Sequence, residues 1–510
     1  MTDMTNNVDV LIVGSGPVGS AFARRISRQG NFQILVAEIG PFLTQPAGQN
    51  VRNLPHDKRQ DAYEMARRGK AVGPVDFVWP EGSLRPRFGT YLVRPGAMGD
   101  PDDIDMPAAT LASNVGGMGA HWTCACPRPG DSEVIGFIDP ARMDRALDDA
   151  EALLGVTQQG FPETEAGRFV RDRLSAIFDA GRDPARRVQP MPLACRPNGG
   201  RLPYWTGTDV VLGELADADK RAQAGVEIRA ETLCRRLITD GNRVTGAELE
   251  DLKTGERYRV SARVVVVAAD ALRTPQLLHA SGIRPDALGH YLNDQPQIVS
   301  LIELMPDRDW SKAGDAGSRD LRDTVTGVSW IPFDAERFPA HGQVMQLEAS
   351  PVDVRIDGNM ATGPVVGLGL FLPKEIRRED RVEFDDERAD HVGMPAIRIR
   401  YGLTEGDRAA VTQAKQVIAE AATALGRFIP TGEPRLTPAG HSIHYQGSYR
   451  MGPSDDGTSV CNADSRVWGF ENLYLGGNGI IPTPIACNPT LTSVALATIA
   501  ADAIVAELAE

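Results

Sequence analysis

Short apolar runs separated by polar, glycine-rich stretches make up most of the first half of the chain. Residues 8–13 and 33–37 are apolar runs on either side of a helical stretch that ends at Arg28. Such runs, bounded by turn residues, predict buried strands, here at the start of a parallel sheet. Further strands are expected at residues 225–229, 233–238, 243–251 and 257–260, as a small antiparallel sheet, and at the valine run 264–268.

The second half alternates strand-like runs with one long helical pattern. The runs cover residues 298–304, 343–349, 365–371 and 396–401, and the helical pattern covers 407–425. This order predicts an antiparallel sheet backed by helices, separate from the first sheet. Helices are also expected over 137–182 and 272–283, with a buried strand at 473–475 and an apolar helix from Pro489 to Ile504. The fold class is therefore α/β with two lobes.

Length and charge narrow the class of protein. The chain has 510 residues, 42% of them hydrophobic, and a net charge of -14, which suits a large core and disfavours nucleic-acid or anionic-membrane partners. We find no long apolar run for a membrane span and no secretory signal near Met1, so a cytoplasmic protein is expected. The six cysteines lack the spacing of a zinc site, so no metal is predicted. No oligomeric state is predicted.

The first strand runs directly into Gly14, Gly16 and Gly19, and a helix follows them. In this setting the glycines allow a tight turn and the close approach of a pyrophosphate to the helix N-terminus. Glu38 ends the second strand, where its carboxylate can accept hydrogen bonds from ribose hydroxyls. The pattern therefore predicts a dinucleotide site.

Two further segments predict a flat cofactor ring. Between residues 113 and 124, glycines bracket His121 and Trp122, as if backbone were pressed against a planar group; the alternative for His121 is a hydrogen-bonded core histidine. Later, Gly476 and Gly477 follow a buried strand, and the helix opening at Pro489 offers free N–H groups. A flavin, whose reduced form is anionic, suits that helix N-terminus.

His444 and Asn488 are expected on the open side of this ring. A neutral imidazole suits removal of an alcohol proton, and an amide that never titrates can hold the substrate oxygen. His441 is the competing base, expected on the other face of a strand, and His444 as a core histidine is the alternative. No second dinucleotide fingerprint and no redox cysteine pair is present, so electrons must come from a bound substrate.

Taken together, these segments resemble the glucose-methanol-choline (GMC) flavoprotein oxidoreductases along the whole chain. Residues 116–124 and 487–492 are most similar to the pyranose oxidase branch, including its shorter bacterial members that act as C-glycoside 3-oxidases. The resemblance implies a Rossmann-like FAD-binding domain with a central parallel sheet at 1–45, 108–150, 225–296 and 453–510. It also implies a substrate-binding domain at 151–224 and 297–452, and an excursion at 46–107 that covers the site or forms an oligomer contact.

The resemblance also implies roles for individual residues. His444 would be the catalytic base, Asn488 its partner on the substrate oxygen, and Gln346 a sugar contact. FAD would be bound by Gly14, Gly16, Gly19, Glu38, Gly116, Gly117, Met118, His121, Trp122, Thr123, Cys234, Asn478, Pro489 and Thr490.

Two departures from the family pattern stand out. Gly119 and Ala120 replace the Ser-Thr that precedes the histidine in members that link FAD covalently, which weakens the expectation of a covalent bond from His121. Asp270 stands where the second family signature usually opens with glycine.

The polar loop 351–363 is either a gate over the site or a surface hairpin.

The implied reaction is FAD-dependent oxidation of the C2 or C3 hydroxyl of a pyranose sugar or glycoside, C-glycosides included. O2 would accept the electrons and give H2O2. The alternatives are a dehydrogenase that passes electrons to a quinone, dye or cytochrome, a non-catalytic flavin electron carrier, and a sterol or simple alcohol oxidase.

Overall fold

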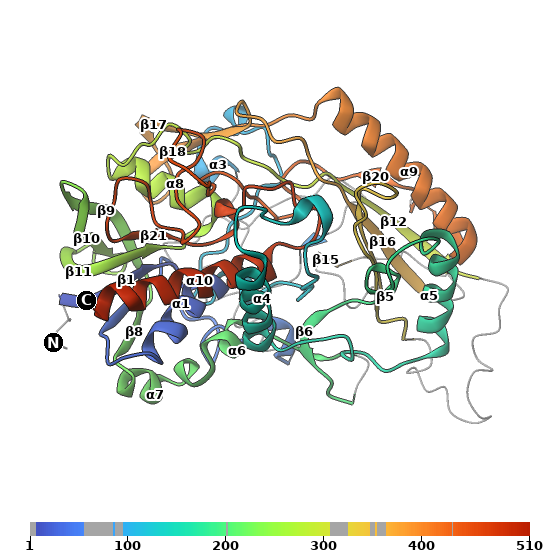
Figure 1. The fold of residues 1–510 in the computed structure, drawn as a ribbon, viewed down its shortest axis with the longest axis horizontal. Helices are drawn as coiled ribbons and strands as arrows, with labels where there is room; N and C mark the ends of the chain where they lie inside the picture. The colour runs from blue at the N-terminus through green and yellow to red at the C-terminus, as the bar shows by residue number, and fades with distance from the viewer. Residues whose placement is uncertain are drawn as a thin grey trace.

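The computed structural model describes residues 7–55, 85–86, 95–199, 202–305, 325–346, 352–353, 364–430 and 432–509. Its two large sheets lie toward opposite ends of the molecule (Figure 1), and the C-terminal helix α10, Thr490–Ala509, lies with the first of them. The sequence around residues 57–68 predicts a further helix, but this segment lies outside the described residues, as does the loop 351–363 apart from positions 352–353.

The first sheet has seven strands in the order β8-β2-β1-β11-β10-β9, with β21 beside β11. Pairing is parallel from β8 to β21 through β2, β1 and β11, and antiparallel between β11, β10 and β9. The strands are β1 (Asn7–Val13), β2 (Ile34–Ala37), β8 (Val226–Arg229), β9 (Thr232–Asp240), β10 (Arg243–Asp251), β11 (Arg257–Val267) and β21 (Leu473–Leu475).

The expected antiparallel unit was wrong in two respects. β8 pairs in parallel with β2 and belongs to the edge of the parallel sheet. The two runs at 257–260 and 264–268 form one strand, β11, which is antiparallel to β10 at its start and parallel to β1. Sequence alternation shows that a strand exists, but long-range pairing decides its direction.

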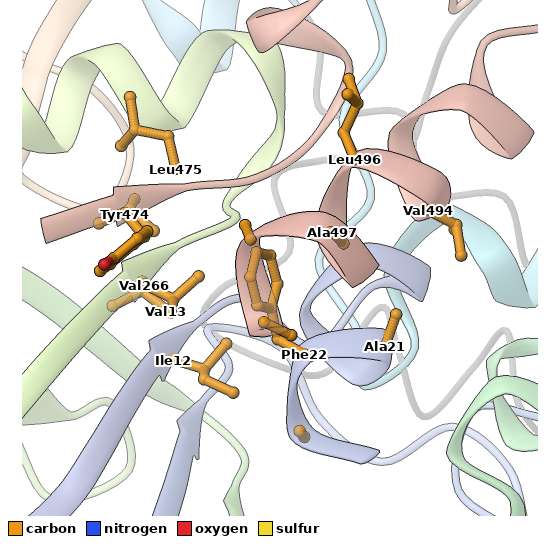
Figure 2. Packing of buried hydrophobic residues seen from close by; sticks show 14 of the residues in the cluster. Ile12, Val13, Ala21, Phe22, Val266, Tyr474, Leu475, Val494, Leu496 and Ala497 are labelled. Carbon is orange, nitrogen blue, oxygen red and sulfur yellow. The ribbon is translucent and has the colours of Figure 1, made fainter. Parts of the chain in front are cut away.

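Apolar helices cover this sheet. α1 (Pro17–Ser27) and α10 contact each other, and Phe22 of α1 lies fully buried near Ile12, Leu475 and Ala497 (Figure 2). By length and composition α10 could span a membrane, but most of it is buried in this core, as a core helix would be. The other helices near this sheet are α4 (Pro140–Leu154), α6 (Thr208–Leu212), α7 (Ala218–Gln223) and α8 (Asp270–Ala280).

The second sheet also has seven strands, in the order β19-β12-β16-β14-β13-β5, with β20 beside β12, and all its pairs are antiparallel. Helices α5 (Glu165–Phe178) and α9 (Glu405–Leu425) pack beside it. The strands are β5 (Gln189–Pro190), β12 (Gln297–Leu304), β13 (Val328–Ile331), β14 (His341–Gln346), β16 (Val365–Phe371), β19 (Gly426–Phe428) and β20 (Arg435–Leu436).

The two faces of the second sheet differ in chemistry. Val366, Leu368 and Leu370 of β16 point into the apolar cluster with α9, so the alternate positions face the other way. The register places three rows on that other face: Gln297, Phe371 and His341; Val299, Gly369 and Gln343; Leu301, Gly367 and Met345.

Smaller elements complete the described fold. Short sheets are formed by β3 (Arg85–Pro86) with β15 (Val352–Asp353), by β17 (Arg381–Ala389) with β18 (Pro395–Arg400), and by β4 (Val156–Thr157), β6 (Leu193–Arg196) and β7 (Tyr204–Trp205). One short helix, α3, covers Pro95–Met98. The described 3-10 turns are Val51–Asn53, Pro101–Asp103, Gly117–Ala120, Asp131–Glu133, Pro184–Arg186, Gly213–Ala216 and Asn478–Ile480.

Candidate active site

A large cavity extends from the β1–α1 turn of the first lobe to the face of the second sheet that carries Gln343 and Met345. It is therefore a space between the two lobes, as binding clefts commonly are. Most of the predicted site residues line it: Gly14, Gly16, Glu38, Gly117, Met118, His121, Trp122, Thr123, Cys234, His444, Asn478, Asn488 and Thr490. Gly19, Gly116, Pro489 and Gln346 are not among the lining residues.

The three glycines of the first turn have different structural roles. Gly14 has φ +102, and a Cβ there would lie 2.3 Å from the carbonyl oxygen of Ala268. A Cβ on Gly19 would lie 2.0 Å from the carbonyl oxygen of Gly14. A Cβ on Gly16 would meet nothing within 4 Å. Gly14 and Gly19 thus close the turn, and Gly16 presents bare backbone to the cavity.

Glu38 is held by the turn rather than free at its tip. Its Oε2 accepts hydrogen bonds from the backbone N–H (3.0 Å) and the hydroxyl (2.7 Å) of Ser15, and its Oε1 accepts from the N–H of Gly40 at 2.9 Å. Burial raises the pKa of this carboxyl, and these hydrogen bonds and Arg273 oppose the rise. Glu38 also lines the cavity, so its carboxylate can accept a hydrogen bond from a ribose hydroxyl of FAD.

Arg273 is a cavity residue that the sequence interpretation missed. Its Nη1 donates to the Ser113 hydroxyl at 2.9 Å, and its charge lies near Glu38 and Asp270. Within the described residues its buried Nη2 has no hydrogen-bond partner. A buried guanidinium nitrogen without a partner is costly, so this N–H is available to an anionic or hydroxyl-bearing ligand.

The structure explains Asp270. It has φ +71, a conformation that glycine adopts easily, and its Oδ1 accepts hydrogen bonds from the N–H groups of Leu272 (2.7 Å) and Arg273 (2.9 Å). The carboxylate therefore caps the start of α8. This capping offsets the conformational strain of a non-glycine residue at that position.

The glycines of the 113–124 segment press mainly against other parts of the chain. A Cβ on Gly116 would lie 2.7 Å from the Cα of Gly48, and one on Gly119 would lie 2.2 Å from the Thr208 hydroxyl. This differs from the expected contact with a flat group alone. Gly117, Met118, Trp122 and Thr123 nevertheless line the cavity.

Of the two glycines after β21, one packs against the chain and the other lines the cavity. A Cβ on Gly476 would lie 2.8 Å from both Val18 and Phe22 of α1, whereas Gly477, with φ +113, lines the cavity. Asn478 accepts a hydrogen bond from the Ser493 hydroxyl at 2.6 Å. Only the second glycine is thus placed to let a ligand approach.

His444 and Asn488 meet at the cavity wall. The Asn488 amide Nδ2 lies 3.2 Å from His444 Nε2, and His444 Nδ1 lies 2.7 Å from Gln295 Oε1. The Gln295 amide donates to the carbonyls of Ile485 (2.7 Å) and Cys487 (2.9 Å), so its oxygen accepts the Nδ1 hydrogen. His444 Nε2 therefore carries the lone pair, and burial lowers the pKa of His444 to about 3.

Two buried carboxylates hold the segments that carry this pair. Glu133 Oε1 accepts hydrogen bonds from the N–H groups of Ala486 (2.9 Å) and Cys487 (2.8 Å). Asp294 accepts from the Ser442 hydroxyl and, at 2.9 Å, from the N–H of Gly440. Burial raises the pKa of both carboxyls, that of Asp294 to about 6.

The expectation for His441 was wrong in its geometry. His441 and His444 both line the cavity, because the segment forms turns and Ile443 has φ +58 instead of extending as a strand. His441 Nδ1 contacts Gln297 Oε1 at 2.8 Å, and burial lowers the pKa of His441 to about 4. The Asn488 contact belongs to His444, which favours His444 as the base.

Gln346 is not placed at the cavity, in contrast to the expected sugar contact. It lies one residue out of phase with Gln343 and Met345, which line the cavity, and its oxygen accepts from the N–H of Gly327 at 3.1 Å. Because strand residues alternate between faces, Gln343 takes the cavity position, and its amide contacts Asn488 Oδ1 at 2.6 Å.

FAD fits this cavity. Gly16 has open space above it, Arg273 has a buried N–H to offer, and the lining continues without a break from Glu38 to His444. The base and amide pair at the far end suits removal of a hydroxyl proton. Fold and site together define an FAD-dependent oxidoreductase that acts on CH–OH groups.

The chain belongs to the GMC oxidoreductase family. Models described as GMC oxidoreductase match residues 210–297 and 377–497. A C-glycoside 3-oxidase of Arthrobacter globiformis is 46% identical over 98% of this chain and 95% of its own length. A second C-glycoside 3-oxidase, from Microbacterium trichothecenolyticum, is 47% identical over 96% of this chain and 95% of its own.

More distant proteins share the architecture. A pyranose 2-oxidase of Tricholoma matsutake is 30% identical over 99% of this chain and 95% of its own. The crystal structure of a pyridoxine 4-oxidase superposes with a TM-score of 0.66 at 18% identity, covering 97% of this chain and 98% of its own. The likeness to the pyridoxine 4-oxidase confirms the fold.

Replacing Gly16 and Gly19 separates cofactor binding from folding. Gly19→Ala should cost about 1–3 kcal/mol or more of folding free energy, because the new methyl group overlaps the turn. Gly16 has φ -62 and open space where a Cβ would lie, so the Gly16→Ala variant should keep its thermal stability. Its methyl group would project into the cavity, so the variant should bind FAD more weakly. Thermal unfolding and flavin content after reconstitution measure the two effects. Unchanged FAD affinity in Gly16→Ala would contradict the assignment.

FAD is expected to be held without a covalent bond. Asn114 donates to the carbonyls of Val115 (2.9 Å) and Gly117 (3.3 Å), so its oxygen accepts from His121 Nε2 at 2.8 Å. Burial lowers the pKa of His121 to about 3. Nε2 therefore carries the hydrogen and has no lone pair for a bond to the flavin. Together with Gly119 and Ala120 in place of Ser-Thr, this argues against a link through Nε2. Acid precipitation should therefore leave all the yellow colour in the supernatant, and flavin in the pellet would refute this.

Proposed function

We propose that the protein oxidises a secondary ring hydroxyl of a pyranose sugar or glycoside to the keto sugar, with C3 as the preferred position and C-glycosides among the substrates. O2 accepts the electrons and becomes H2O2. The observation that carries the reaction type is His444 Nε2 beside the Asn488 amide at 3.2 Å on the cavity wall. The names of the two relatives at 46% and 47% identity support the position and the substrate class.

The chain's own groups handle the proton and the oxygen. His444 takes the hydroxyl proton at Nε2, since Nδ1 already donates to Gln295. The Asn488 N–H holds the substrate oxygen, and Glu133 fixes the loop beneath it. FAD, when bound, supplies the acceptor for the hydride that leaves the ring carbon. The alcohol thus loses one hydride and one proton, as a ketone requires.

One part of the cavity wall is flat and apolar. On β16, Gly367 and Gly369 place no side chain on the cavity face, and a Cβ on either would have no described atom closer than 3.9 Å. Val299 and Leu301 of β12 flank this flat stretch. This apolar shelf, defined by Gly367 and Gly369, supports a substrate with an apolar group attached to the sugar.

An anaerobic screen of free monosaccharides against C- and O-glycosides tests the function. Bleaching of the flavin followed by location of the new carbonyl identifies substrate and position. Peroxide yield under air, compared with dye reduction under argon, separates an oxidase from a dehydrogenase. If no sugar or alcohol bleached the flavin, a non-catalytic electron carrier would replace this proposal.

His444→Ala should abolish flavin reduction by substrate while FAD stays bound. The imidazole is the proposed proton acceptor, and losing a general base typically costs about 10²–10⁴-fold in rate. Stopped-flow absorbance under anaerobic conditions measures the rate, and His441→Ala serves as the matched control that should still reduce. Normal reduction by His444→Ala would exclude it as the base.

Gly367→Phe should discriminate between substrates by size. The new ring would fill the apolar shelf, so a glycoside with a large apolar group should lose kcat/KM about tenfold or more, the value of a few lost apolar contacts, while a free sugar keeps its value. Gly367→Ala, whose methyl group has room, is the control. Equal losses for both substrates would place the bulky group elsewhere.

A further inference from the structure

A buried chain of hydrogen-bonding groups connects β13 to the catalytic pair. Apart from His444, which is half-buried, each member is at most 7% exposed. The contacts are Trp330 Nε1 to His341 Nδ1 (2.9 Å), His341 Nε2 to the Gln343 amide (2.9 Å), Gln343 to Asn488 (2.6 Å), Asn488 to His444 Nε2 (3.2 Å) and His444 Nδ1 to Gln295 (2.7 Å).

The chemistry of the two ends is fixed. At one end, the indole N–H of Trp330 can only donate, so His341 Nδ1 must accept and a neutral His341 carries its hydrogen on Nε2. At the other end, Gln295 donates to two backbone carbonyls, so its oxygen takes the hydrogen of His444 Nδ1. A neutral His444 therefore always presents a lone pair at Nε2.

Between these ends one contact cannot be satisfied while His444 is neutral. A single amide atom of Gln343 contacts both His341 and Asn488. If that atom is nitrogen, two N–H groups face each other in either tautomer of His341. With hydrogen on Nε2 the conflict is with Gln343, and with hydrogen on Nδ1 it is with Trp330. If it is oxygen, Asn488 must turn its nitrogen to Gln343, and its oxygen then faces the lone pair of His444.

A proton on His444 Nε2 removes this conflict. Asn488 oxygen then accepts from His444, the Asn488 nitrogen and His341 Nε2 both donate to the Gln343 oxygen, and Trp330 donates to His341. Every contact pairs one donor with one acceptor, which buried polar groups require. The network therefore favours the protonated state of His444, in opposition to burial.

We propose that Trp330 and His341 act as a positioning pair that raises the proton affinity of His444 Nε2 and so strengthens it as the base. Neither residue lines the cavity, so they act through Gln343 and Asn488. The proposal rests on His444 being the base. It assigns a role to two buried side chains on β13 and β14 that need not touch substrate or cofactor.

Other charges near His444 must be separated from this effect. Asp294 accepts a hydrogen bond from the backbone N–H of His444, His441 shares its turn, and Phe371 packs on its ring. Arg186 acts on His341. Glu133 lies beneath the 486–487 loop. Burial raises the pKa of Asp294 to about 6, so this carboxyl can add a pH limb of its own, and Asp294→Asn is a needed reference.

The test is the pH dependence of flavin reduction in the anaerobic holoenzyme. A base works when deprotonated, so the second-order rate constant falls as pH drops through the pKa of His444. Trp330→Phe removes the fixed donor, so His341 can carry its hydrogen on Nδ1 and accept at Nε2. The contacts from His341 Nε2 through Gln343 and Asn488 to a neutral His444 then all pair. The acid limb should therefore move down by about one pH unit, since one unit equals about 1.4 kcal/mol, the scale of one hydrogen bond.

Controls separate this effect from loss of packing. Val328→Ala, on the same strand as Trp330, should lower stability without moving the limb. His341→Phe should give the same shift as Trp330→Phe, and the double variant should shift no further, because both break one network. If Trp330→Phe does not fold, His341→Phe carries the test alone.

If the protein unfolds at a higher pH than the one at which the rate of flavin reduction falls, a second measurement at neutral pH covers that case. At neutral pH a weaker base should lower the limiting rate of flavin reduction about threefold to tenfold, with the substrate dissociation constant unchanged. An unmoved limb together with an unchanged limiting rate would overturn the proposal. Because wild-type reduction is measured in the same experiment, that result would leave the proposed function intact.

Discussion

The amide of Gln295 is the contact on which the catalytic geometry depends. Its nitrogen donates to the carbonyls of Ile485 and Cys487, and its oxygen accepts from His444 Nδ1. One side chain thus joins the turn that carries the base to the loop that carries Asn488. Because both donor hydrogens are committed to carbonyls, the amide cannot rotate without losing two buried hydrogen bonds, so the tautomer of His444 is fixed.

Burial sets the protonation states of the histidines and carboxyls around this contact, and it makes their charged forms less stable. Histidines in the cavity wall remain neutral because desolvation disfavours imidazolium, whereas buried carboxylates such as Glu133 and Asp294 become harder to ionise. Each of these carboxylates accepts hydrogen bonds from backbone N–H groups of a loop near the site. In the first lobe, the positive charge of Arg273 lowers the pKa of both Glu38 and Asp270 and so opposes the effect of their burial.

In the second sheet, alternate residues of one strand face the core and the cavity. One face of β16 packs against α9, and the opposite face presents the apolar shelf beside Gln343 and Phe371. Since strand positions alternate, one strand can contribute to the core and to the cavity wall at once. The sheet therefore supplies Gln343 and the apolar shelf to the cavity wall, while its opposite face packs in the core.

The sequence by itself determined the α/β class, the first turn with its glycines, and the pair His444 and Asn488. These features depend on short-range patterns: apolar period, glycine spacing and the proline at the start of α10. Resemblance to a family added the cofactor and the reaction class, which the comparisons confirm.

Only the tertiary structure decided the direction of β8, the placement of Gln343 instead of Gln346, and the shared exposure of His441 and His444 to the cavity. It also revealed Gln295, Arg273 and Glu133. These outcomes depend on pairing and contacts between residues far apart in the chain, and on one left-handed residue, Ile443. Local patterns carry no information on such contacts, because a buried glutamine or carboxylate acquires its partners only when distant loops come together.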